Sequence, residues 1–242
     1  MTTPGPVLLI TGASSGIGAV TARRARDEGW RLLLVARSPE INEFAARLGG
    51  PHVVQAAVTD VTDMAGLRRA VDQATDAFGG LDAAFVNAGI SAGPLRYQPE
   101  PSEEPGDGSV AGWRDMVLTN VLGVALTVRA VVNALVASQG RLVITGSVLG
   151  RYAMSSSFYS ATKHAVAGIA ETVRLELIGT GVGVTLVEPG PVATAFAAGA
   201  AAGGAGPALG RDDVASAVLY ALSQPTGVDV NELLLRPHGA TP

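Results

Sequence analysis

The chain has 242 residues, of which 48% are hydrophobic, and a formal net charge of −4 at pH 7. This length and apolar content can bury one large core, so we expect residues 1–242 to form a single dinucleotide-binding and catalytic domain. The acidic balance argues against nucleic acid as a partner, and the lack of cysteine excludes disulfides and thiolate metal ligands.

Strand-like and helix-like segments alternate along the chain, as a parallel sheet with helices on both faces requires. The expected strands are residues 7–11, 31–36, 52–57, 83–87, 141–145, 182–188 and 230–235. The expected helices are residues 16–28, 39–48, 63–78, 111–138, 157–179 and 211–223. Right-handed crossovers then predict an α/β fold with a Rossmann-like, doubly wound, seven-stranded parallel sheet, which binds ligands at the carboxyl ends of its strands.

The first strand leads directly into a glycine-rich turn, Gly12-Ala13-Ser14-Ser15-Gly16-Ile17-Gly18, and then into a helix. Glycines permit a tight turn and let backbone amides approach a pyrophosphate at the positive end of the helix. The spacing G-x-x-x-G-x-G differs from the commoner G-x-G-x-x-G, so we expect a related but distinct phosphate-binding loop.

The end of the second strand indicates which dinucleotide binds. Leu34 to Ser38 carries no acidic residue that would accept from the ribose 2′-hydroxyl of NAD, and it carries Arg37, which would accommodate the 2′-phosphate of NADP. The alternative is that Arg37 is a solvated loop cation.

Lys163 is the only lysine among 17 basic residues, and it follows Tyr159 by four positions. On a helix this spacing places both side chains on one face, where a compact ammonium can stabilise the phenolate. The pair therefore favours a general acid/base, although a surface pair with a chance lysine gives the same spacing.

Six motifs in order resemble the short-chain dehydrogenase/reductase family over nearly the whole chain. They are Thr11-Gly12-x-x-x-Gly16-x-Gly18, Asn87-Ala88-Gly89-Ile90, Asn120, Ser147, Tyr159-x-x-x-Lys163 and Pro189-Gly190. The resemblance implies hydride transfer between a nicotinamide cofactor and a carbonyl or alcohol carbon.

The resemblance also implies site residues. The catalytic set is Asn120, Ser147, Tyr159 and Lys163, with Tyr159 as proton donor or acceptor, Ser147 binding the substrate oxygen and Asn120 holding a water that relays protons to Lys163. The implied cofactor-binding residues are Gly12, Ser14, Ser15, Gly16, Ile17, Gly18, Arg37, Asp60, Val61, Asn87, Ala88, Gly89, Tyr159, Lys163, Pro189, Gly190, Val192 and Thr194. Ser15 stands where some NADP-dependent members carry a second basic residue, which weakens the NADP assignment.

Ser147 departs from the family pattern, because it precedes Tyr159 by 12 positions, about one fewer than usual, and follows Gly146 where a second serine is common. The loop must close more tightly, and Thr145 is the reserve candidate. Ser155, Ser156 and Ser157 lie near the helix start and are expected to cap it.

Two segments interrupt the alternation. Residues 91–110 are rich in proline, glycine and acid, and we favour a solvated surface insertion over a flap at the pocket mouth. Residues 191–210, mostly alanine and glycine from 195 onward, occupy the place of the family's substrate lid and favour a neutral or apolar substrate. Val148, Leu149, Tyr152, Met154 and Phe196 predict an apolar pocket, while for Arg151 we favour an outward salt link over binding an acidic substrate group.

The function expected is an NADP(H)-dependent oxidoreductase of the ketoreductase type. The alternatives are an imine reductase or epimerase on the same scaffold, or a non-catalytic NADP-binding regulatory protein, which the Tyr159 and Lys163 pair argues against. The glycine turn excludes a halohydrin dehalogenase, in which a halide site replaces it. His52, His164 and His238 share no metal-ligand spacing, so no metal site is expected.

We expect a homotetramer, or at least a homodimer, built on the apolar helices 111–138 and 157–179. No uninterrupted apolar run of about 18 residues is present, so we expect no membrane span, and the N-terminus enters the first strand too early for a signal peptide. The expected location is cytoplasmic.

Overall fold

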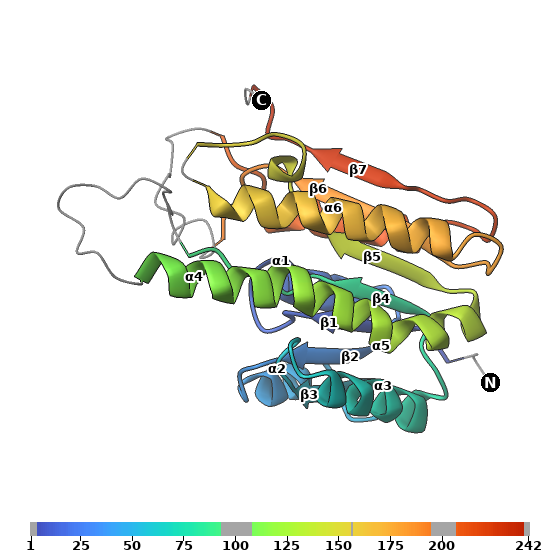
Figure 1. The fold of residues 1–242 in the computed structure, drawn as a ribbon. Coiled ribbons are helices and arrows are strands. Elements are labelled where there is room, and N and C mark those ends of the chain that lie inside the picture. Colours follow the sequence, from blue (N-terminus) through green and yellow to red (C-terminus); the bar gives the residue numbers. More distant parts are fainter. Residues whose placement is uncertain (1–3, 93–107, 156, 195–206, 240–242) are drawn as a thin grey trace.

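The computed structural model describes residues 4–92, 108–155, 157–194 and 207–239. Within these ranges a seven-stranded parallel sheet runs in the order β3-β2-β1-β4-β5-β6-β7 (Figure 1). The strands are β1 (Val7–Thr11), β2 (Arg31–Ala36), β3 (Val54–Val58), β4 (Ala83–Val86), β5 (Arg141–Thr145), β6 (Gly183–Pro189) and β7 (Glu232–Leu235). The predicted fold class is confirmed.

Helices cover both faces of the sheet. They are α1 (Gly16–Asp27), α2 (Ile41–Leu48), α3 (Met64–Phe78), α4 (Gly108–Met116), the π-helix η1 (Val117–Leu122), α5 (Gly123–Ser138), the 3₁₀-helix η2 (Val148–Gly150), α6 (Phe158–Glu176) and α8 (Arg211–Leu222). α4, η1 and α5 continue one another as a single long helix (Figure 1).

Side chains of each central strand alternate between two apolar cores, because successive residues of a strand point to opposite faces. In β1, Leu8 and Ile10 pack with α1, α2 and α8, whereas Val7 and Leu9 pack with α3, α5 and α6. Strands buried on both faces need continuous apolar runs rather than polar alternation, which is why these segments could be recognised in the sequence.

The predicted elements agree with the observed ones to within a few residues at each end, apart from the helix expected over 111–138. That helix starts three residues earlier, at Gly108, so residues 108–110 belong to α4 and the insertion predicted over 91–110 is too long at this end. The helix expected over 111–138 also contains the π-helical segment η1 between α4 and α5, which the sequence did not predict. Residues 93–107 of the insertion lie outside the described residues.

The expectation of no membrane span rested on the lack of an uninterrupted apolar run, and one helix meets a looser criterion. Among the described residues, Val110–Ser138 is one helix long and apolar enough to do so by length and composition, with a mean hydropathy of 1.9 over 18 residues. A helix that packs on a sheet inside a domain has the same properties, and 33% of this window is buried in the fold. Uninterrupted apolar runs are therefore too strict a criterion for such a helix.

Candidate active site

The predicted motifs converge at one edge of the sheet. β1, β4, β5 and β6 are neighbours in the sheet, and Gly12, Asn87, Ser147 and Gly190 follow their carboxyl ends. This is the edge at which an open α/β sheet binds its ligands.

The turn after β1 requires glycine at three positions. Gly12 and Gly16 have φ angles of +66° and +57°, which side chains rarely adopt, and a Cβ on Gly12 would lie 2.9 Å from the Cα of Ala88. A Cβ on Gly18 would lie 2.4 Å from the carbonyl oxygen of Gly12. The first turn of α1 has no acidic residue and its N-cap, Ser15, makes no side-chain cap, so the backbone N–H groups there are available to an anion. The turn thus fits the pyrophosphate of a dinucleotide.

A hydrogen-bond network joins this turn to the neighbouring strands. The Thr11 hydroxyl accepts from the backbone N–H groups of Asn87 and Ala88, at 3.0 and 3.2 Å, and the Asn87 amide donates to the Thr11 carbonyl oxygen at 3.2 Å. Thr145 Oγ1 donates to Asn87 Oδ1 at 3.3 Å. Thr145, the reserve candidate for the substrate-binding hydroxyl, therefore helps to hold the strand ends together.

Arg37 and Asp60 lie together at the ends of β2 and β3. Asp60 Oδ1 accepts from the backbone N–H and the hydroxyl of Thr62, at 2.8 and 2.7 Å, which fixes the carboxylate. Arg37 Nη1 lies 3.8 Å from Asp60 Oδ2, and 64% of the Arg37 side chain is exposed. The guanidinium is held loosely and can turn toward an anion.

Tyr159 and Lys163 lie on one face of α6, as their spacing predicted. The Lys163 ammonium is 5.6 Å from the centre of the Tyr159 ring and donates to the Thr145 carbonyl oxygen at 2.8 Å. Burial lowers the pKa of Lys163 to about 8. Burial also raises the pKa of Tyr159 above its ordinary value, while a hydrogen bond with Ser147 lowers it by less.

In the protein alone the Tyr159 pKa is raised, whereas the sequence-based expectation was a depression produced by the ammonium and the nicotinamide cation together. In the protein alone, the free-energy cost of removing the phenolate from water is larger than the stabilisation that it gains from neighbouring groups. Tyr159 therefore keeps its proton at neutral pH.

Ser147 is the N-cap of η2 and is buried, with 7% of its surface exposed. Its Oγ accepts from the backbone N–H of Leu149 at 3.1 Å and lies 3.5 Å from the Pro189 carbonyl oxygen. The accepted bond orients the hydroxyl, and the bond to Tyr159 joins the two side chains. Ser157 caps α6 as predicted, accepting from the backbone N–H of Ser160 at 3.3 Å, and Ser156 lies outside the described residues.

Asn120 is fully buried in η1. Its Oδ1 accepts from the Ile90 N–H and its Nδ2 donates to the Ile90 carbonyl oxygen, both at 2.8 Å, and Nδ2 also donates to Thr162 Oγ1 at 3.2 Å. The amide thus joins η1 to the segment after β4 and to α6, far from its own position in the sequence. No local residue pattern predicts these partners, because only the fold brings Ile90 and Thr162 next to Asn120.

The remaining predicted residues surround this site. Ser14 is exposed, Ile17 is half-buried in the first turn of α1, and Val61 is buried against Gly123 of α5. Thr194 lies near the glycine turn, since a Cβ on Gly16 would be 3.9 Å from its Cγ2.

Gly190 and Val192, both predicted to bind the cofactor, fix the start of the segment predicted to be a lid. Gly190 donates its N–H to the Leu235 carbonyl oxygen at 2.8 Å, and Val192 pairs with Leu209. Residues 195–206 of the lid, including Phe196, lie outside the described residues.

Two ring contacts near the site escaped the sequence analysis. Trp113 of α4 stacks on Phe158, the residue before Tyr159, with ring centroids 4.8 Å apart. The Arg236 guanidinium lies 5.2 Å from the centre of the Tyr152 ring. Both pairs join residues at least 45 positions apart, so no local pattern could have revealed them.

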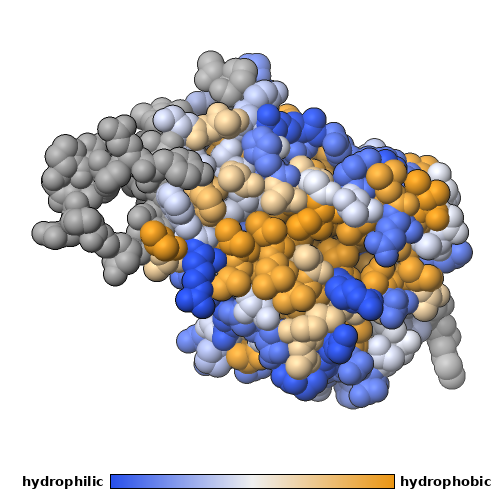
Figure 2. Space-filling model, viewed as in Figure 1, coloured by the Kyte–Doolittle hydropathy of each residue, from blue (hydrophilic) through white to orange (hydrophobic). Residues whose placement is uncertain are grey.

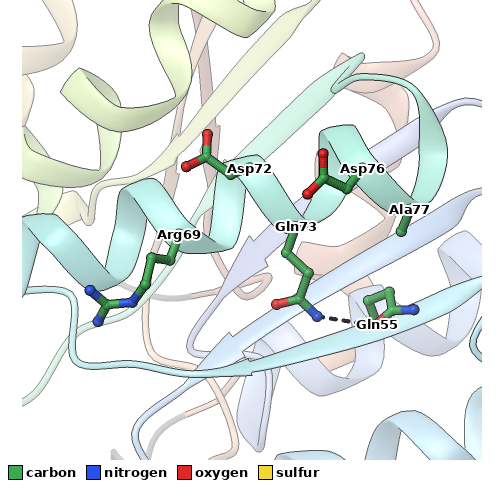
Figure 3. Close-up of a pocket in the computed structure, with 6 residues that line it drawn as sticks. All are labelled: Gln55, Arg69, Asp72, Gln73, Asp76 and Ala77. Atoms are coloured by element: carbon green, nitrogen blue, oxygen red, sulfur yellow. Dashed lines mark hydrogen bonds between the residues drawn. The ribbon is translucent and has the colours of Figure 1, made fainter.

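A separate shallow pocket of about 440 Å³ lies between β3 and α3, lined by Gln55, Arg69, Asp72, Gln73, Asp76 and Ala77 (Figure 3). The Gln73 amide donates to Gln55 Oε1 at 3.0 Å and to the Ala56 carbonyl oxygen at 3.1 Å, covering the edge strand. The pocket lies near the start of β3 and the end of α3, away from the carboxyl edge. None of the predicted site residues lines it, so we assign it no part in the chemistry.

Comparisons with known proteins agree with this site. A family model described as short chain dehydrogenase matches residues 6–203. Sulfoacetaldehyde reductase 2 of Chromohalobacter salexigens is 34% identical over 244 residues, covering 96% of this chain and 94% of that protein.

Solved structures extend the likeness to the fold. An alcohol dehydrogenase of the archaeon Thermococcus sibiricus, complexed with 5-hydroxy-NADP, matches with a TM-score of 0.83 and 27% identity over 98% of both chains. A 3-ketoacyl-(acyl-carrier-protein) reductase of Brucella melitensis, complexed with NADH, matches with a TM-score of 0.83 and 25% identity, over 96% of this chain and 97% of that one. The family model, the relative and the shared fold together show that this chain belongs to the short-chain dehydrogenase family of oxidoreductases.

Proposed function

We propose that the protein is an NADP(H)-dependent ketoreductase that interconverts a ketone or aldehyde and the corresponding alcohol. The observation that carries the proposal is the grouping of the Tyr159 phenol, the Ser147 hydroxyl and the Lys163 ammonium beside a glycine turn shaped for a dinucleotide. We further propose that residues 1–242 act as one domain.

When bound, the nicotinamide cofactor supplies or accepts the hydride. Ser147 would hydrogen-bond the substrate oxygen, on which negative charge develops during reduction. Tyr159 would donate its proton to that oxygen, and Lys163 would stabilise the resulting phenolate. Burial raises the pKa of Tyr159, so the phenol holds its proton at neutral pH and has one to donate.

The preference for NADP(H) is supported by Arg37, whose exposed guanidinium meets no acid nearer than Asp60, at 3.8 Å, among the residues that the structure describes. A charge-assisted contact with the 2′-phosphate is expected to be stronger than this long pair. The related structures hold both kinds of nucleotide, so the preference rests on this residue.

The substrate class can be tested with a panel drawn from the named relatives. We would measure NADPH and NADH consumption with sulfoacetaldehyde, an acetoacetyl thioester, and plain aliphatic and aromatic ketones. Turnover of at least one carbonyl compound is expected. A panel in which imines are reduced and carbonyl compounds are not would replace the ketoreductase with an imine reductase.

An exposed apolar surface supports the proposed homo-oligomer. On the face viewed in Figure 2, apolar side chains gather over α5 and α6. The exposed apolar residues of these helices and of η1, which continues α5, include Val117, Leu122, Val136 and Leu175. An apolar surface of this kind is typical of protein interfaces.

A cytoplasmic location stays a prediction, which cell fractionation would test.

A further inference from the structure

A buried carboxylate that the proposed reaction does not use lies directly behind the Ser147 turn. Glu188, near the end of β6, is 1% exposed, and its Oε2 accepts from Arg151 Nε at 2.7 Å and from Nη2 at 2.6 Å. Arg151 Nη2 also contacts Glu232 of β7. These contacts raise the pKa of Arg151, so the guanidinium is fixed as a cation. Arg151 therefore forms the predicted salt link, but the link is only partly outward, since Glu232 is exposed and Glu188 is buried.

The Arg151–Glu188 ion pair links the turn that follows Ser147 to strand β6. Arg151 is the C-cap of η2, four residues after Ser147, and its N–H donates to the Val148 carbonyl oxygen at 3.0 Å. On the other side, the Gly146 N–H donates to the Val187 carbonyl oxygen at 2.7 Å. The turn that presents Ser147 is thus held to β6 at both ends, by a backbone bond before the serine and by the ion pair after it.

Gly146 shows how closely the Glu188 side chain lies beneath this turn. A Cβ on Gly146 would be 3.0 Å from Glu188 Cγ and 3.0 Å from Leu186 Cδ1, tighter than most real contacts. The serine that is common at this position in the family would crowd both side chains, so the close packing of Glu188 and Leu186 suits a glycine here.

The carboxylate depends on Arg151 for its compensation. Glu188 Oε1 is buried and has no hydrogen-bond partner among the described residues. A buried carboxylate without a paired cation is strongly disfavoured. Removing Arg151 would leave the buried Glu188 carboxylate without its paired cation. A shift of that side chain toward solvent would disturb the Gly146–Ser147 backbone that packs against it.

We propose that Arg151 is a positioning residue that acts through Glu188 to hold the Ser147 hydroxyl against Tyr159. The proposal rests on the role given to Ser147 above. It predicts that the loss caused by removing Arg151 requires Ser147 to be present, because in this proposal Arg151 acts only through the position of the serine.

A double-mutant cycle tests the coupling. Arg151→Met, Ser147→Ala and the double variant would be assayed for kcat and KM with NADPH and the panel carbonyl compound turned over fastest. Arg151→Met is expected to lower kcat by about ten-fold or more in the Ser147 background and by less than about two-fold in the Ser147→Ala background, the behaviour of groups that act as one unit. NADPH binding, measured by fluorescence titration, should be unchanged, and Arg151→Lys should restore part of the loss.

Arg174→Met is the matched control, because Arg174 makes two bonds of 2.8 and 2.7 Å to Glu171 on α6, away from the site. Hydrogen exchange of residues 148–152 should be faster in Arg151→Met and unchanged in Arg174→Met. If Arg151→Met does not fold, Glu188→Gln, which keeps the side-chain volume, takes its place in the same cycle. Ser147→Ala with full activity would contradict the proposed function, whereas an Arg151 loss of equal size in both backgrounds would overturn only the positioning role.

Discussion

Lys163 is a single residue whose proposed role requires a buried charge, and burying that charge reduces the stability of the fold. It is 4% exposed, and burial lowers its pKa to about 8 from 10.5. The sequence predicted this lysine and its partner because its residue type and spacing are local. It could not predict the sign of the Tyr159 shift, since desolvation depends on every element packed around the phenol.

We predict that Lys163→Met stabilises the cofactor-free protein at pH 7 by about 1–3 kcal/mol, because the cost of burying the ammonium disappears. The folded pKa is depressed, so below pH 8 the lysine is charged in both states and the full cost is present. Between about pH 8 and 10.5 only the unfolded state stays charged, so wild-type stability rises and the advantage of the variant shrinks. Urea unfolding across this pH range measures the effect, and a variant less stable than wild type at pH 7 would contradict it.

Arg37 is predicted to set the nucleotide preference. A charge-assisted bond to the 2′-phosphate contributes about 1.5–3 kcal/mol, or roughly ten- to a hundred-fold in affinity, and Ser15 adds no second cation. Replacing Ala36 with Asp and Arg37 with Gln should reverse the preference, because the new carboxylate accepts from the ribose hydroxyl and repels the phosphate. The check is kcat/KM with each nucleotide for both proteins. A wild type that prefers NADH would show Arg37 to be a solvated loop cation.

At the scale of elements, the sequence predicts what local rules control. Continuous apolar strands and glycine-bounded helices can be recognised, and each predicted strand is present. The π-helix η1 cannot be predicted in this way, because it accompanies bonds from Asn120 to Ile90 and Thr162, which only the fold brings near. The Arg151 to Glu188 pair, 37 residues apart, was missed as a specific pair for the same reason.

The first turn of α1 gives the sharpest prediction for an element. Gly18→Ala would place a Cβ 2.4 Å from the Gly12 carbonyl oxygen and push the loop away from its observed shape. NADPH affinity is expected to fall at least about ten-fold, since the loop supplies the backbone donors for the pyrophosphate. Gly50→Ala is the control, because a Cβ there meets nothing within 4 Å. Equal nucleotide affinity in both variants would show that the loop does not hold the phosphates.

At the scale of the whole molecule, we predict that the apolar surface over α5 and α6 is buried between subunits. Light scattering at micromolar concentration should show a tetramer or at least a dimer. Leu122→Arg should shift the protein toward monomer, because a charge buried in an apolar interface is costly. Tyr220→Arg changes a similarly exposed residue on α8 of the opposite layer and should leave the assembly intact. A monomeric wild type would reject the assembly and leave the enzymology untouched.

The whole fold brings Tyr159, Ser147 and Lys163 from two separate segments to one place beside the glycine turn. The most direct test of this account is a single-turnover measurement of NADPH oxidation with the best panel substrate, comparing wild type with Tyr159→Phe. The phenylalanine ring keeps the packing and removes only the proton donor, so NADPH binding should be retained while turnover falls at least about 100-fold. Retention of more than about a tenth of the wild-type rate would show that Tyr159 is not the acid/base, and the proposed reaction would have to be assigned to another group.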